Sequence, residues 1–203
     1  MKDKISCFTS DSNIFNKSYG QWTVRWWKWA LSTPRSKNPV LDKTGENHAV
    51  NQPSSDVWFL AGVFGDEEKY HPTRKIKLPE GLSILFPVLN CEANSIEYPH
   101  LKNDNDLIKH VSDDVGTVIK KDCYINDIKV IPERVKSDPV IFEFIIPKDN
   151  VLGVEGGQVV RASADGYWVF LSSLTKGKYL IDFEGSCEYG RLSSGAKYEL
   201  EII

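Results

Sequence analysis

The chain has 203 residues, of which 41% are hydrophobic and 26% are charged, and its formal net charge is −3 at pH 7. This length fits one large domain with a substantial core, and the scattered lysines and arginines exclude the basic footprint of a nucleic-acid-binding protein. No apolar run approaches the roughly 20 residues that a membrane-spanning helix requires.

The first residues predict an arm followed by a helix. Residues 1–17 are polar and lack periodicity, so we expect a loosely ordered N-terminal arm ahead of a single domain that spans 18–203. A helix is predicted over 18–32, because Ser18 followed by Gln21 matches a capping box and Pro34 stops the segment.

This helix contains four of the six tryptophans. Trp22, Trp26 and Trp29 form one stripe at helical spacing, whereas Trp27 lies to one side of it. Core packing is the favoured interpretation, because each ring buries a large area. The alternatives are an aromatic platform for a flat ligand and a helix lying in a membrane interface. If one of these rings binds a ligand, we expect it to be Trp27, because it lies off the main stripe.

The next segment, 34–55, is rich in Pro, Asn, Asp and Ser and predicts a long loop. Asp42, Glu46, His48 and Gln52 bring carboxylate, imidazole and amide groups close together in the sequence. They could bind a ligand or a cation, or a carboxylate could orient His48 as a general base. The favoured alternative is a loop that hydrogen-bonds to itself, with Asp42 capping a turn.

Two strand regions follow the loop. "DVWFLAGVFG" and "RKIKLPEGLSILFPVLN" predict buried strands, and Pro87 indicates a sheet edge or a bulge. Asn90 and Glu92 at the strand end could line a ligand pocket together with the Asp42 loop. Cys91, paired with His48, His71 or His100, is a weaker candidate nucleophile. The turn over 65–72 could hold a cation through Asp66, Glu67 and His71.

The rest of the chain predicts a second helix and a run of strands. Leu107, Val111 and Val115 recur at helical spacing, so a helix is expected near 104–120. "CYINDIKVI" predicts a hairpin, and five further short strands follow it. The predicted fold is mainly β (α+β): an antiparallel β-sandwich with the tryptophan-rich helix and the second helix packed against it.

The four cysteines, Cys7, Cys91, Cys123 and Cys187, are widely spaced and match no zinc or redox motif. They could form two disulfides in an oxidising compartment or remain four buried thiols in a reducing one. The start of the chain lacks the apolar segment of a secretory signal, which slightly favours thiols and a cytoplasmic protein.

Several blocks together resemble a family of uncharacterised microbial proteins, most of which carry secretion signals. The blocks are W-x-W-A-x-x-x-P, N-P-x-x-D-x-T-G, V-W-F-L-A-G, F-P-x-x-N and D-G-Y-W, found in that order at 27–34, 38–45, 57–62, 86–90 and 165–168. The resemblance covers nearly the whole chain from Tyr19 onward. It implies a shared fold and a secreted ancestry, and it implies no activity.

Three hypotheses for function remain. The favoured one is a non-catalytic binding or structural module that recognises a glycan, a small molecule or a protein through its end loops. The second is a hydrolase or metal-dependent enzyme that uses the 42–52 loop with Glu92 and a histidine. The third is a surface protein that assembles into a homo-oligomer through its sheet edges or its aromatic face. No cofactor and no nucleic-acid partner is expected.

Overall fold

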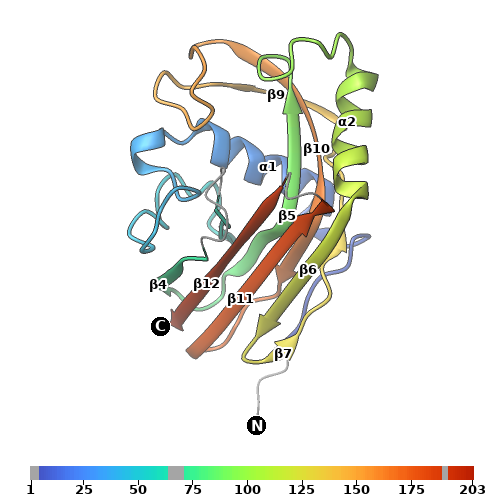
Figure 1. The fold of residues 1–203 in the computed structure, drawn as a ribbon. Helices are drawn as coiled ribbons and strands as arrows, with labels where there is room; N and C mark the ends of the chain where they lie inside the picture. The colour runs from blue at the N-terminus through green and yellow to red at the C-terminus, as the bar shows by residue number, and fades with distance from the viewer. Residues whose placement is uncertain (1–4, 64–70, 189–191) are drawn as a thin grey trace.

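The computed structural model describes residues 5–63, 71–188 and 192–203, which fold into two β-sheets, a small hairpin and two α-helices (Figure 1). Sheet I contains, in spatial order, β3 (Val57–Phe59), β5 (Ser83–Asn94), β10 (Val159–Leu171) and β8 (Glu133–Arg134), and β9 (Ile141–Ile145) also pairs with β10. Sheet II contains β4 (Thr73–Leu78), β12 (Ser193–Ile202), β11 (Gly177–Cys187), β6 (Val118–Ile125) and β7 (Ile128–Lys129). The hairpin pairs β1 (Asn13–Ile14) with β2 (Lys17–Ser18), and the helices are α1 (Tyr19–Ser32), α2 (Asp104–Gly116) and the short 3-10 helix η1 (Arg35–Lys37).

The mainly β fold with two helices is confirmed. Most strand pairs are antiparallel, as expected, but each sheet has one parallel pair: β3 with β5 in sheet I, and β4 with β12 in sheet II. A parallel neighbour requires a long connection between the two strands, so the spacing of turns along the sequence did not indicate it.

Helix α1 follows its prediction closely. The Ser18 side chain accepts a hydrogen bond from the Gln21 backbone, and the Gln21 side chain accepts one from the Ser18 backbone, which completes the capping box. The indole of Trp26 donates to the carbonyl of Leu60 at 2.8 Å and meets Trp168 edge-to-face at 5.4 Å between centroids. The helix is therefore core structure. In the described part of the chain, no helix has both the length and the apolar character needed to cross a membrane.

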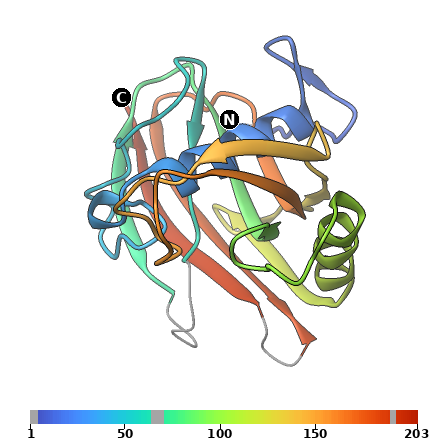
Figure 2. The ribbon, with the colours of Figure 1, turned by 90° about the horizontal axis from the view of Figure 1, so that it is seen from above.

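The apolar residues form three clusters that define the layers. One lies between α1 and sheet I, and a second lies between sheets I and II. The third lies beneath α2 and includes Cys91 and Ala93 from β5. Figure 2, seen from above, shows α1 crossing sheet I and α2 standing at one side. Among the described residues, no helix covers the outward face of sheet II (Figure 1).

The expected irregularity at Pro87 is a bulge. Trp168 lies opposite Pro87 and Tyr167 lies opposite Leu89, so Val88 is the extra residue in β5. A bulge reverses which face alternate residues occupy. Val88 therefore contributes to the core between the sheets, whereas Asn90 and Glu92 share the face that α1 covers.

Two predicted boundaries were wrong. The second helix ends at Gly116 instead of continuing to 120, and Val118 and Ile119 belong to β6. "GQVVRASAD" and "GYWVFLSSL" form one continuous strand, β10, although Gly166 suggested a break. Gly166 serves a close backbone approach instead of a turn: a Cβ placed there would lie 2.7 Å from Cβ of Asn90.

The prediction of a loosely ordered arm was also wrong for residues 5–17, while residues 1–4 lie outside the described residues. The backbone N–H of Phe8 donates to the carbonyl of Phe170 at 2.8 Å, and the two rings meet edge-to-face. The N–H of Ser172 donates to the carbonyl of Ser6 at 3.0 Å. The arm is thus attached to the end of β10 by backbone pairing that its polar composition did not reveal.

Candidate functional site

The 34–55 loop is organised around the carboxylate of Asp42. One carboxylate oxygen accepts the backbone N–H groups of Thr44 and Gly45, and the other accepts the N–H of Asn47 at 2.7 Å. Burial acts to raise the pKa of Asp42, but these three donors and the charge of Arg74 outweigh it and hold the pKa below its usual value. Asp42 therefore fixes the shape of the loop.

Gln52 and His48 attach the same loop to β3. The Gln52 side-chain amide donates to the carbonyls of His48 and Phe59, and its oxygen accepts the N–H of Phe59. The His48 ring lies 5.5 Å from the ring of Trp58. Burial lowers the pKa of His48 against the opposing charge of Asp42, so the imidazole is neutral at pH 7.

Arg74 on β4 holds the 34–55 loop through hydrogen bonds of its guanidinium. Its side chain is 1% exposed and donates to the backbone carbonyls of Asp42, Ala61 and Gly62 and to the hydroxyl of Tyr198. A buried guanidinium needs its donors satisfied, and these four acceptors come from three separate segments. The loop, the end of β3 and β12 are consequently held in one arrangement.

A hollow of about 550 Å³ lies where this loop meets the edge of sheet II. It is lined by Thr44, Gly45, Glu46 and His48 from the loop and by Thr73, Lys75, Ile76 and Lys77 from β4. The lining offers hydroxyl, carboxylate, imidazole and ammonium groups. Of the residues predicted from sequence, Glu46 and His48 line the hollow. Asp42 and Gln52 do not line it, but their hydrogen bonds hold the loop that does.

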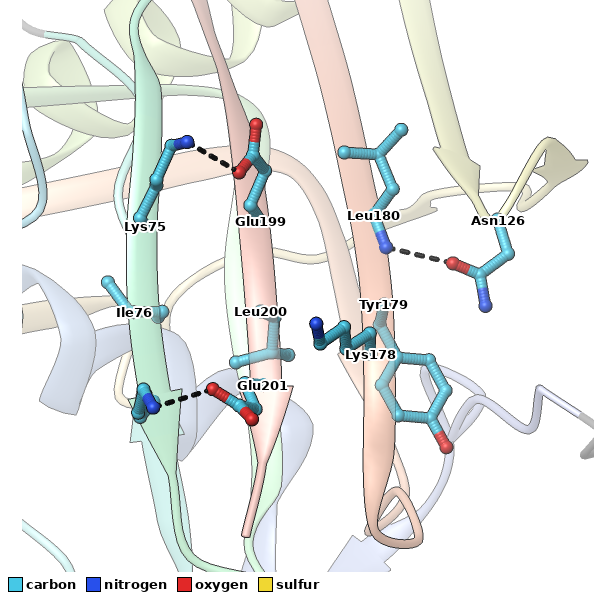
Figure 3. Close-up of a pocket in the computed structure, with 10 residues that line it drawn as sticks. Lys75, Ile76, Asn126, Lys178, Tyr179, Leu180, Glu199, Leu200 and Glu201 are labelled. Atoms are coloured by element: carbon cyan, nitrogen blue, oxygen red, sulfur yellow. Dashed lines mark hydrogen bonds and ion pairs between the residues drawn. The ribbon is translucent and has the colours of Figure 1, made fainter.

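A second hollow, of about 490 Å³, lies across β4, β12 and β11 and shares Lys75, Ile76 and Lys77 with the first. Figure 3 shows its floor, where lysine and glutamate side chains alternate across neighbouring strands. Lys75 pairs with Glu199 at 3.0 Å and Lys77 pairs with Glu201 at 2.8 Å, and all four side chains are at least 38% exposed. Strand β4 thus borders two adjoining hollows that both carry charged side chains.

Asn90 and Glu92 do not join this site. No hydrogen bond or ion pair found between described residues links either of them to the 42–52 loop. Glu92 is 8% exposed and accepts a hydrogen bond from Asn94, which also donates to Glu97. Burial, followed by the charge of Glu97, raises the pKa of Glu92 to about 8. Its second oxygen, Oε1, is buried without a hydrogen-bond partner in the described structure.

The structure disfavours two other candidates from the sequence, Trp27 and Cys91. Trp27 is 1% exposed and packs edge-to-face on Trp26 at 5.2 Å, so it forms no part of an exposed ligand platform. Cys91 lies 3.7 Å from the Asp114 carboxylate, and burial raises its pKa well above the usual value, which disfavours a thiolate nucleophile. The four cysteines are all free thiols, with Cys7 exposed and the other three buried.

A comparison of the chain with protein-family models, with curated proteins and with solved structures finds no match to any of them. The family resemblance of the motif blocks therefore stays a prediction. Within 5–63, 71–188 and 192–203, no group of three or more His, Cys, Asp or Glu residues is arranged to hold a metal ion. Of the candidate cation ligands in the 65–72 turn, Asp66 and Glu67 lie outside the described residues, and His71 is hydrogen-bonded to Asp182 at 2.8 Å.

Sequence reasoning missed the lysines of β4. In Thr73–Leu78 exposed and buried residues alternate, so Thr73, Lys75 and Lys77 share the exposed face of the strand. That alternation was a usable signal for a polar sheet face. The neighbours that turn the face into a hollow, Glu199 and Glu201, come from a strand far along the chain and could not be assigned from spacing.

Proposed function

We propose that this chain is a non-catalytic binding module that recognises a neutral oligosaccharide along β4. The observation that carries the proposal is the pair of adjoining hollows that share Lys75, Ile76 and Lys77. A ligand long enough to lie across β4 would contact both of them, which suits a chain-like molecule better than a compact one.

The polar groups of the two hollows suit hydroxyl-rich ligands. A sugar hydroxyl both donates and accepts, so it can donate to the carboxylate of Glu199 and accept from the ammonium of Lys75. Exposed ion pairs of this kind contribute little to stability, so a ligand can replace them at small cost. The equal mixture of ammonium and carboxylate groups favours a neutral sugar over an anionic one.

The enzyme hypothesis gains less from the geometry. Both carboxylate oxygens of Asp42 are engaged by backbone N–H groups, so Asp42 is poorly placed to act as a base or a metal ligand. Glu92, the second carboxylate in that hypothesis, faces the layer that contains α1. The 42–52 loop serves the proposed module by shaping the hollow and presenting Glu46 and His48.

The test is an NMR titration of the ¹⁵N-labelled protein with neutral hexasaccharides of glucose, xylose and N-acetylglucosamine at millimolar concentrations. At least one sugar should shift the amide signals of 44–48 and 73–77 together. The double variant Lys75→Ala, Lys77→Ala should abolish the shifts. Lys109→Ala removes another exposed, ion-paired lysine, on α2, and should leave them unchanged. Shifts that map elsewhere, or none with any sugar, would overturn the proposal.

A further inference from the structure

Strand β9 is an uncovered edge of sheet I. The N–H of Ile146 donates to Gln158 and its carbonyl accepts from Gly157, so the backbone of Ile146 points toward β10. Backbone groups alternate along a strand, and those of Ile141, Glu143 and Ile145 therefore point away from β10. No other described segment hydrogen-bonds to these outward groups. Figure 2 shows β9 crossing above α1.

The same edge exposes an apolar pair. Ile145 is 61% exposed, and Val159, directly opposite it on β10, is 62% exposed. Unpaired backbone groups beside exposed β-branched side chains form a template for another strand. A strand that paired here would satisfy the backbone groups and cover both side chains at once.

The sequence of the edge identifies the partner. Residues 139–147 read "PVIFEFIIP", which is nearly the same in both directions about Glu143. We propose that two copies of this chain pair antiparallel through β9, with the twofold axis at Glu143. Ile141 then lies opposite Ile145 of the second copy, and Phe142 lies opposite Phe144. Residues 141, 143 and 145, whose backbone groups point away from β10, therefore lie opposite residues 145, 143 and 141 of the second copy. Each of these pairs can form both of its backbone hydrogen bonds.

The two Glu143 carboxylates weaken this pairing, and the neighbouring arginines offset part of the effect. Glu143 meets its own copy at the axis, and like charges directly opposite each other are destabilising. Arg161 lies opposite Glu143 on β10, with Nε 3.9 Å from the carboxylate oxygen, and also pairs with Asp104 on α2 at 2.6 Å. The dimer therefore has a row of four charges with the two carboxylates flanked by arginines, which screens their repulsion.

Two prolines limit the extent of the pairing. Pro139 and Pro147 stand at equal distances from Glu143 and lack the N–H that would continue the ladder. The interface is consequently one short strand from each copy, smaller than a standard protein interface. We expect a reversible dimer with a dissociation constant on the order of 10–100 µM.

Sedimentation velocity over a range from about one-tenth to ten times that dissociation constant should show the 23.0 kDa chain converting to a dimer. Ile145→Glu should weaken the dimer at least about tenfold, because each new carboxylate lies diagonally across from Glu143 of the second copy and adds to the like charges at the axis. Ile131→Glu makes the same change at an isoleucine that is 71% exposed elsewhere and should have no effect. Glu143→Gln should tighten the dimer several-fold. A chain that stays monomeric throughout overturns the proposal, as does a dimer that Ile145→Glu leaves unchanged.

A cross-link tests the register directly. Glu143→Cys in a Cys7→Ser background should be joined to its copy by a short bis-maleimide, because residue 143 lies on the axis. Glu199→Cys in the same background places the thiol on the outward face of sheet II and should stay uncross-linked. Equal cross-linking of the two variants would overturn the assignment of the interface to β9.

Discussion

Replacement of Glu92 by glutamine should stabilise the protein at neutral and alkaline pH and leave its stability at acid pH almost unchanged. Glutamine keeps the shape of the side chain and an oxygen for the hydrogen bond from Asn94. It removes the charge that the wild-type side chain acquires when it ionises in a buried position beside Glu97. The size of the effect therefore follows from how far the fold displaces the pKa of Glu92.

The folded protein holds the Glu92 proton more tightly than the unfolded chain, because its pKa is about 8 against an ordinary value of 4.5. Stability from this group is thus fully present below pH 4.5 and is lost as the pH rises toward 8. One unit of pKa corresponds to about 1.36 kcal/mol, so the loss is about 3 kcal/mol at pH 7 and about 5 kcal/mol at pH 9. With Glu92 8% exposed, solvent screening reduces these values little.

Urea unfolding of the wild type and Glu92→Gln, measured from pH 4.5 to pH 9, gives the difference in the free energy of unfolding. That difference should be near zero at the acid end and grow with pH. In a Glu97→Gln background the same comparison should level off at a lower pH, because the charge that supplements burial is gone. A difference that is flat across the whole range would refute a raised pKa for Glu92.

Three further outcomes are expected. Trp26→Ala should lower the free energy of unfolding by roughly 3–5 kcal/mol in urea titrations, since it removes a buried ring and its hydrogen bond to Leu60; a loss below about 1 kcal/mol would contradict the core position. Asp42→Ala should cost about 2–4 kcal/mol because it leaves the N–H groups of Thr44, Gly45 and Asn47 without their acceptor, and an unchanged melting temperature would show that the loop does not depend on it. A thiol reagent should count four thiols in the denatured protein, and a count of zero would indicate disulfides instead. In the native protein only Cys7 lies at the surface and should react, but slowly, because partial desolvation of its thiol by the surrounding atoms and the charge of Glu133 raise its pKa to about 11.

The sequence predicted the features of the fold that depend on near neighbours. The capping box of α1 needs only Ser18 and Gln21, and the hairpin turn needs only Asn126 and Asp127, which both adopt positive φ. Each of these contacts spans at most four residues, so the local pattern contains all the information.

The candidate site was predicted less well because its parts come from distant segments. Loop residues were recognised by composition, but their roles depend on Arg74, which no local pattern connects to Asp42. Asn90 and Glu92 were grouped with the loop as residues of a strand end, but β5 continues to Asn94, and the extra residue at Val88, which Pro87 alone could not locate, decides which face of the sheet they occupy. A shift of one residue sends those side chains to the opposite face of the sheet.

The parallel pairing of β4 with β12 has a consequence for how the chain folds. Thr73 lies opposite Lys197, so more than half of the chain must be closed into a loop before β4 gains its only strand neighbour among the described residues. The entropy of that closure is lost before any hydrogen bond of the pair forms. We therefore expect the hollow that spans β4, β12 and β11 to be assembled in a late and slow phase of folding.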